Sequence, residues 1–267
     1  MRSRSAADAR GVSEVVGFVL VFSLVIGTIT MVYVGGLSGL DGARDAERIN
    51  NAERAFDVMA NNFEQMARGE APNRATEMKL ADAQLTTGSE QDLEINVSSS
   101  DDPVLATKTV AIRYDSPGDS NIVYENGAVI RVDDGNAVMR QEPDFLFSED
   151  GNVVVRYIAL NGIDQGVGGS STTVLVRAER RTTSVNSSDT TTDIGIVMET
   201  HPDRADVWAE YYEEQIETAA VSGSWGSGDA CSVNESYGGP QEALVYCDEF
   251  DADSLSVASV EIDVTLT

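Results

Sequence analysis

A run of 26 residues without any charge, from Val15 to Leu40, dominates the N-terminal part of the chain. Its first part is rich in valine, isoleucine, leucine and phenylalanine. As an α-helix, the run would be about 39 Å long, which is enough to cross a hydrocarbon core of about 30 Å. Arg2, Arg4 and Arg10 precede it, and basic flanks stay in the cytoplasm. The sequence therefore predicts one membrane-spanning helix, with the long C-terminal part outside the cell.

Three kinds of N-terminal segment combine a basic start with an apolar run. A secretory signal has a shorter apolar region followed by a small-residue cleavage site, so the length of this run argues against it. An uncleaved signal anchor fits the physical pattern. In a prepilin-type leader, a peptidase cuts before the apolar helix, and that helix remains in the mature protein.

The residues RGVSEVVGF, at positions 10–18, resemble the class III leader of haloarchaeal type IV pilins. The resemblance covers residues 8–40 and implies a cut between Gly11 and Val12 by a prepilin-peptidase-like enzyme. Glu14 stands where many of those pilins have proline, and we assign it no amine-pairing role. The resemblance further implies a structural or adhesive pilin-like surface protein. Its expected partners are membrane lipid before assembly, and then other pilin subunits or copies of itself.

An amphipathic stem follows the apolar run. Between residues 43 and 68 the apolar positions are spaced by three and four residues, which is a heptad pattern on a helix. The seam consists of Ile49, Ala52, Phe56, Met59, Phe63 and Met66. Gly69 and Pro72 then give a helix stop signal. Pilin stems also dock on their own head domain, so the seam does not separate a pilin from a signal anchor.

Gly35 and Gly39 form a GxxxG pattern near the end of the apolar run. This spacing allows two helices to approach closely in lipid or in a filament core. Glycines also lower helix propensity by about 1 kcal/mol each, which favours a kink or a melted turn. The sequence leaves these two interpretations equally open.

From about residue 75 onwards, apolar and polar residues alternate as they do in β-strands. We expect an α+β chain, whose head is mostly antiparallel and forms a sandwich or an open barrel of about eight strands. Asn126-Gly127 between two apolar runs predicts a hairpin. Polar clusters at 161–171 and 182–190 predict loops. The expected strands lie at 93–97, 109–114, 122–131, 137–141, 152–160, 172–179, 191–199 and 256–267.

One further helix is expected over residues 203–218, where Pro202 suits the first turn. Its aromatic residues Trp208 and Tyr211 are more typical of a helix fixed on a sheet than of a ligand-stacking pair. The expected domains are a leader at 1–11, a membrane or filament-core helix at 12–40, a stem at 41–70 and a head at 71–267.

Two kinds of covalent modification are expected in the external part. Cys231 and Cys247 are the only cysteines, so a disulfide between them is the simplest prediction for an exported protein. N-glycosylation sequons begin at Asn96, Asn186 and Asn234. We expect the last two to lie in polar loops and Asn96 to lie in a strand that partly occludes it.

The net charge of −27 excludes some partners and suggests a habitat. So acidic a chain is a poor partner for phosphate backbones, and we expect no nucleic-acid binding. Only Lys79 and Lys108 are lysines among 18 basic residues. Such a surface stays soluble in molar salt, where the screening length is about 3 Å, so the composition indicates a halophile.

The sequence contains none of the common nucleotide-binding, hydrolase or zinc-protease motifs. His201, the only histidine, precedes Pro202 and is expected to lie at the surface or to cap a helix. The acidic pairs Asp133-Asp134 and Asp251/Asp253 lack the spacing of an EF-hand loop. We therefore expect no enzyme, no cofactor and no metal site. Two alternatives remain: an uncleaved, signal-anchored binding or sensory protein, and a membrane-tethered hydrolase.

Overall fold

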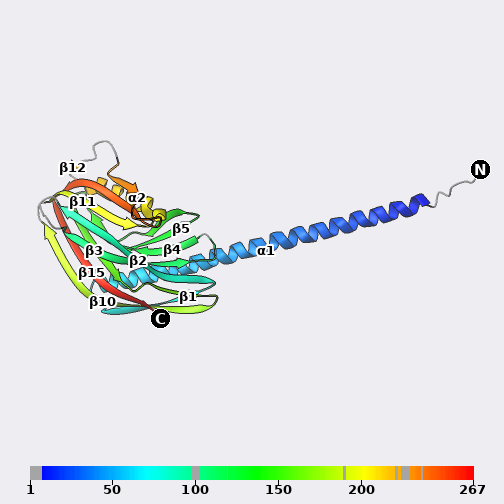
Figure 1. Ribbon diagram of the computed structural model, residues 1–267, viewed down its shortest axis with the longest axis horizontal. Coiled ribbons are helices and arrows are strands. Elements are labelled where there is room, and N and C mark those ends of the chain that lie inside the picture. Colours follow the sequence, from blue (N-terminus) through cyan, green and yellow to red (C-terminus); the bar gives the residue numbers. More distant parts are fainter. Residues whose placement is uncertain are drawn as a thin grey trace, which may run out of the picture. The chain divides into compact units, whose positions relative to one another are not determined.

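The computed structural model describes residues 8–97, 103–118, 120–188, 191–219, 222–223, 229–235 and 237–267. These residues form two helices and fifteen strands, and all strand pairs except one are antiparallel. The prediction of an α+β chain with a long N-terminal helix and a mostly antiparallel β head is confirmed (Figure 1). Contacts divide the chain into two units, Met1–Glu47 and Arg48–Thr267.

Helix α1 comprises Asp8–Ala67 and is continuous through the glycine-rich stretch, so the alternative of a melted turn there is not observed. A Schellman motif ends the helix. The Gly69 N–H donates to the carbonyl of Met66 at 3.0 Å, and the Glu70 N–H donates to the carbonyl of Gln65 at 2.9 Å. Gly69 has φ +82°, which glycine adopts without a steric penalty. The predicted stop signal is therefore confirmed.

The strands form one sheet of five and one of ten strands. The order in the first is β1-β10-β15-β8-β7; in the second it is β12-β14-β11-β2-β3-β4-β5-β6, where β13 also pairs with β14 and β9 with β2. The parallel pair is β8 with β15. The bounds are β1 Asn73–Leu80, β2 Ala83–Val97, β3 Leu105–Asp115, β4 Ser120–Glu125, β5 Ala128–Asp133, β6 Asn136–Gln141, β7 Phe145–Phe147, β8 Asn152–Asn161, β9 Gln165–Gly169, β10 Thr172–Ser188, β11 Thr191–Thr200, β12 Ser222–Gly223, β13 Cys231–Asn234, β14 Ala243–Ala252 and β15 Ser254–Leu266.

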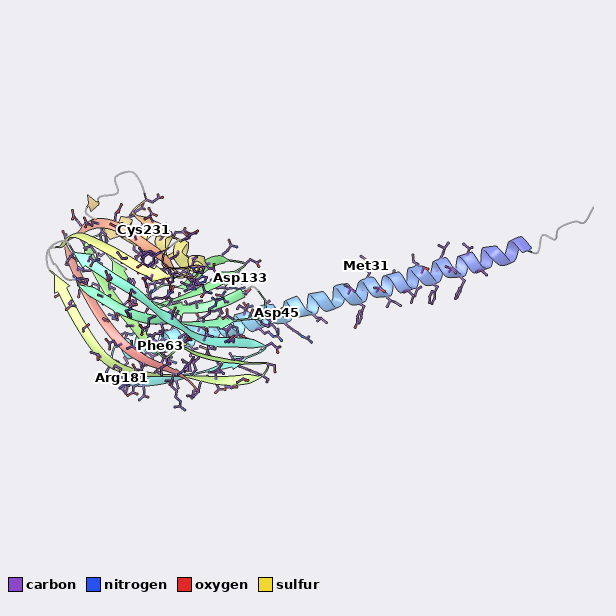
Figure 2. All side chains as sticks on the ribbon, in the orientation of Figure 1. Met31, Asp45, Phe63, Asp133, Arg181 and Cys231 are labelled. Atoms are coloured by element: carbon purple, nitrogen blue, oxygen red, sulfur yellow. A yellow bond between two sulfur atoms is a disulfide. The ribbon has the colours of Figure 1, made fainter. Side chains whose placement is uncertain are left out.

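The stem part of α1 forms a core with both sheets. All six seam residues are buried, and Phe56, Met59 and Met66 are fully so. They pack with inward-facing residues of β1, β10 and β15 from one sheet and of β2 to β5 from the other. In Figure 2, Phe63 lies among the strands of the head. Its ring meets that of Tyr124 edge-on, with centroids 5.0 Å apart. The predicted seam is thus the side of the helix that the head covers.

A second core lies under helix α2, which comprises Pro202–Ala219 and confirms the helix predicted at 203–218. This helix packs on β14, β13 and β6. Trp208 is fully buried and stacks against Tyr212, with centroids 5.6 Å apart. The aromatic residues therefore fix the helix on the sheets, as the sequence predicted.

The number and extent of the strands differ from the prediction. The segment 182–190 was expected to be a loop, but β10 runs to Ser188 because its second half pairs with β15. Likewise, β9 lies within the expected loop 161–171 and pairs with β2. The strands β13 and β14 were missed as well. β13 lies in a glycine- and serine-rich region that resembles a loop, whereas β14 contains neither residue and pairs with β11.

Candidate functional site

The apolar span of α1, Val15–Gly36, is the one helix among the described residues that is long and apolar enough to cross a membrane. No part of this 22-residue span is buried inside the described chain. Phe18 is 69% exposed, and Met31, labelled in Figure 2, is 80% exposed. So large an exposed apolar surface is typical of segments that contact lipid or other protein chains. The coarse prediction of a membrane-type helix is therefore confirmed.

Two hydroxyl groups within the span are satisfied inside the helix. The hydroxyl of Thr28 donates to the carbonyl of Val25 at 2.9 Å, and that of Thr30 donates to the carbonyl of Ile26 at 2.8 Å. In hydrocarbon, an unsatisfied polar group costs several kcal/mol, so such back-bonding removes the main obstacle to burial in lipid or in a dry bundle. The span is thus chemically suited to an apolar environment on every side.

The glycines of the span leave open space beside the helix. A Cβ added at Gly35 or Gly36 would meet no other described atom within 4 Å, apart from the backbone of its own helix. No intramolecular contact therefore requires glycine at these two positions. Gly39 belongs to the same helix, and so do Gly11 and Val12, between which the leader cut was predicted.

The stem is held on the head by charged contacts as well as by its seam. Glu53, whose side chain is 14% exposed, accepts from the Nε of Arg140 at 2.7 Å and lies 3.4 Å from the Nη1 of Arg131. At the helix end, the guanidinium of Arg180 donates to the carbonyl of Met66 at 3.2 Å. The head therefore packs on the apolar face of the stem and also binds part of its polar surface.

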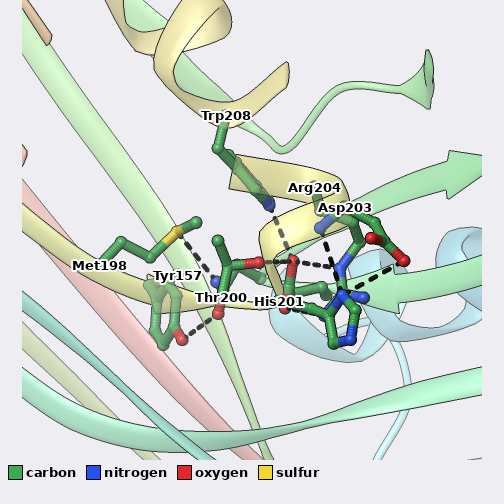
Figure 3. A network of polar contacts seen from close by, with 9 residues as sticks. Tyr157, Met198, Thr200, His201, Asp203, Arg204 and Trp208 are labelled. Carbon is green, nitrogen blue, oxygen red and sulfur yellow. Dashed lines mark hydrogen bonds and ion pairs between the residues drawn. The ribbon is translucent and has the colours of Figure 1, made fainter. Parts of the chain in front are cut away.

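A buried carboxylate ties α2 to the tip of the β4–β5 hairpin (Figure 3). Glu125 accepts hydrogen bonds from Arg204 at 2.8 and 3.0 Å, from Trp208 Nε1 at 2.8 Å and from the hydroxyl of Thr200 at 2.8 Å. Burial by itself would raise the pKa of Glu125. The positive charge of Arg204 and these hydrogen bonds nevertheless hold that pKa below its ordinary value of 4.5. Glu125 thus stays ionised and acts as a structural anion.

The hairpin turn itself is buried beneath this network. Asn126 is 2% exposed and has φ +51°, and Gly127 follows with φ +91°, which matches the predicted Asn-Gly hairpin. The Asn126 side chain accepts from the hydroxyl of Tyr157 and lies 3.2 Å from the sulfur of Met198. A turn that usually faces solvent is therefore part of the second core.

His201 lies at the N-cap of α2, where the Asp203 N–H donates to its Nδ1 at 3.2 Å. Burial, followed by the positive charge of Arg204, lowers the pKa of His201. The sequence prediction of a capping histidine is confirmed. The described residues contain no group of three or more His, Cys, Asp or Glu placed to hold a metal ion.

The predicted disulfide between Cys231 and Cys247 is confirmed. The two cysteines are directly opposite each other on β13 and β14. In Figure 2, Cys231 lies on the side of the head that α2 covers. The backbone N–H of Ala230 donates to Glu213 of α2 at 2.9 Å, so the disulfide-bonded strand also fixes the helix.

The three sequon asparagines lie in strands. Asn96 is half-buried in β2, as expected. Asn186 is exposed but lies in β10 and not in a loop, where its amide donates to the carbonyl of Val104 at 2.9 Å. Asn234 is exposed at the end of β13. Ser98 and Ser236, the third residues of two sequons, lie outside the described residues.

Sequence reasoning missed Glu125 and Arg204. The signal available was a glutamate directly before a strong hairpin turn, after the run Ile122-Val123-Tyr124. Arg204 was hidden among the acidic residues at the start of α2. Their pairing could not be inferred, because 79 positions separate them.

No curated protein and no solved structure matches the chain significantly. A family model described as a family of unknown function matches residues 10–265, so the match includes both the apolar span and the head. The chain therefore belongs to this family of unknown function, DUF7289.

Proposed function

We propose that this protein is a pilin-like surface protein of a halophilic archaeon, and that it is a structural or adhesive subunit of a type IV pilus-like filament or an accessory to one. In this proposal a prepilin-peptidase-like enzyme cuts between Gly11 and Val12. The apolar span then leaves the lipid and packs with the spans of other subunits. The head faces the surroundings.

The observation that carries the proposal is that one part of α1 is buried by its own head and another part is exposed. The stem residues from Ile49 to Met66 are covered by the head of the same chain, whereas Val15–Gly36 is covered by nothing in the described chain. Burial of apolar surface is worth about 25 cal/mol per Å². The span is therefore the surface from which cohesion between subunits would come.

The head supports the proposal by its construction. Its two cores and its disulfide make a compact external body, and its charge suits concentrated salt. Cohesion of the spans must exceed the repulsion between heads of strongly negative chains. Filaments should therefore need high salt.

The test is to shear cells grown in molar salt and to separate surface filaments from membranes by sedimentation. The proposal expects the protein in the filament fraction, and expects it to be lost from that fraction on dilution to low salt. A protein found only in the membrane fraction would favour the alternative, which is an uncleaved, signal-anchored binding or sensory protein.

A further inference from the structure

A polar pocket of about 260 Å³ lies between strands β2–β4 and the N-terminal end of α2. Figure 3 shows two of its lining residues, His201 and Arg204, at the start of that helix. The strands contribute Gly88, Ser89, Gln91 and Arg113, among others, and the segment before β14 contributes Glu242. The pocket belongs entirely to the head.

A β-bulge shapes the floor of the pocket. The register between β2 and β3 shifts between Thr87 and Glu90, which takes Gly88 and Ser89 out of the regular ladder. Bulges bend a strand and redirect its side chains, and they are common beside functional sites. A Cβ at Gly88 would meet only the carbonyl oxygen of Ala111, at 3.7 Å, which is an ordinary contact. The fold therefore tolerates a side chain at Gly88, although that side chain would occupy pocket space.

The two arginines that line the pocket are paired with carboxylates of the same chain. The Nε of Arg113 donates to Asp115 at 2.6 Å, and Arg204 is bound to Glu125. Asp115 and Glu242 also line the pocket, so its basic and acidic residues are equal in number. His201 is neutral near pH 7, because burial and Arg204 lower its pKa. Such a lining gives little preference to an anion or to a cation.

The lining instead offers both donors and acceptors of hydrogen bonds. Ser89 has a hydroxyl and Gln91 has an amide. His201 accepts at Nδ1 from the Asp203 N–H, which leaves an N–H at Nε2 as a donor. Each hydroxyl of a sugar can likewise donate and accept. Only Ala111 and Val123 contribute apolar side chains.

We propose that this pocket binds one neutral sugar ring of a cell-surface glycan. Sites for drug-sized ligands have volumes of about 300–1,000 Å³, so a pocket of about 260 Å³ suits a single ring. The inference rests on the proposed function in that a surface protein of this kind needs a ligand to adhere to. Under this proposal, the head adheres to surfaces that carry such glycans.

The experiment uses the full chain in a detergent without a sugar headgroup, because maltoside or glucoside detergents would compete for the pocket. Neutral monosaccharides, and their sulfated forms, are titrated by calorimetry and by saturation-transfer NMR. The test variant is Gly88→Ala. The matched control is Gly195→Ala in β11, where a Cβ would meet atoms only at 4.0 Å and where the residue does not line the pocket.

We expect saturable binding of at least one neutral sugar. The affinity should fall by at least about tenfold in Gly88→Ala and stay unchanged in Gly195→Ala, since overfilling a packed site is costly. Absence of saturable binding of any neutral sugar would overturn the inference, and so would equal affinity in the two variants or binding restricted to sulfated sugars. None of these results would alter processing before Val12 or recovery in filaments, so the proposed function fails or stands separately.

Discussion

Glu125 and Arg204 form a two-point ion pair inside the head, with Oε1–Nη2 and Oε2–Nε distances of 2.8 and 3.0 Å. Their side chains are 0% and 5% exposed, so solvent does not screen the pair. The pair joins the end of β4 to the first turn of α2. Trp208 donates to the same carboxylate, which places the apolar and the ionic anchors of α2 side by side.

Replacing the carboxylate should strongly destabilise the head. In Glu125→Gln the guanidinium of Arg204 stays buried without a counter-charge, and breaking such a pair costs about 3–5 kcal/mol. The measurement is the free energy of unfolding of the full chain in denaturant, followed by tryptophan fluorescence. As a control, Asp82→Asn breaks the exposed Arg48–Asp82 pair and should cost less than about 1 kcal/mol. Equal losses in the two variants would contradict this account of α2.

The same pair predicts how stability depends on pH. Because folding lowers the pKa of Glu125 below 4.5, the carboxylate contributes stability that is fully present above its unfolded pKa. This contribution is lost as the pH falls through the lower, folded pKa. The difference in unfolding free energy between wild type and Glu125→Gln should therefore shrink below about pH 4.5. A difference that is constant from neutral to acid pH would exclude Glu125 as the titrating group.

Because the stem is docked on the head, shortening a buried side chain of its seam should strongly lower the free energy of unfolding. Phe63 is 1% exposed and packs edge-on against Tyr124, so Phe63→Ala should cost about 3–5 kcal/mol of unfolding free energy. Val58 lies one turn away on the same helix but is 55% exposed. Val58→Ala should change stability by less than about 0.5 kcal/mol. Similar effects of the two substitutions would mean that the stem is not docked.

If the apolar spans of neighbouring subunits pack together, a large side chain at a glycine should weaken filament assembly only on the helix face that makes the contact. Gly35→Leu places a large side chain on the GxxxG face, whereas Gly36→Leu places it about 100° around the helix. At either position an added Cβ would meet no other described atom within 4 Å, apart from the backbone of its own helix, and both substitutions raise helix propensity. Filament recovery after shearing should therefore fall for Gly35→Leu and be largely kept for Gly36→Leu. Equal recovery of the two variants would remove the GxxxG face from the assembly.

Local patterns predicted the elements whose period repeats over many residues. The heptad seam from Ile49 to Met66 gave the buried face of the stem, and Asn126-Gly127 gave the β4–β5 hairpin. The disulfide followed from the presence of only two cysteines. In each case a short-range rule sufficed, because helix period, turn conformation and cysteine number need no knowledge of distant partners.

Features that depend on distant partners were not predictable. The polar residues 181–188 form a strand because β15 pairs with them along one edge. The buried hairpin turn and the ion pair of Glu125 depend on where α2 docks, which no local pattern specifies. Likewise, continuity of α1 through Gly35 and Gly36 could not be decided from helix propensity alone.

The N-terminus of the protein isolated from its native cell surface tests the central claim most directly. Intact mass and N-terminal sequencing would identify it. The account predicts that the chain begins at Val12, so that the apolar span of α1 is free of its arginine-bearing leader. A native chain that retains residues 1–11 would contradict it.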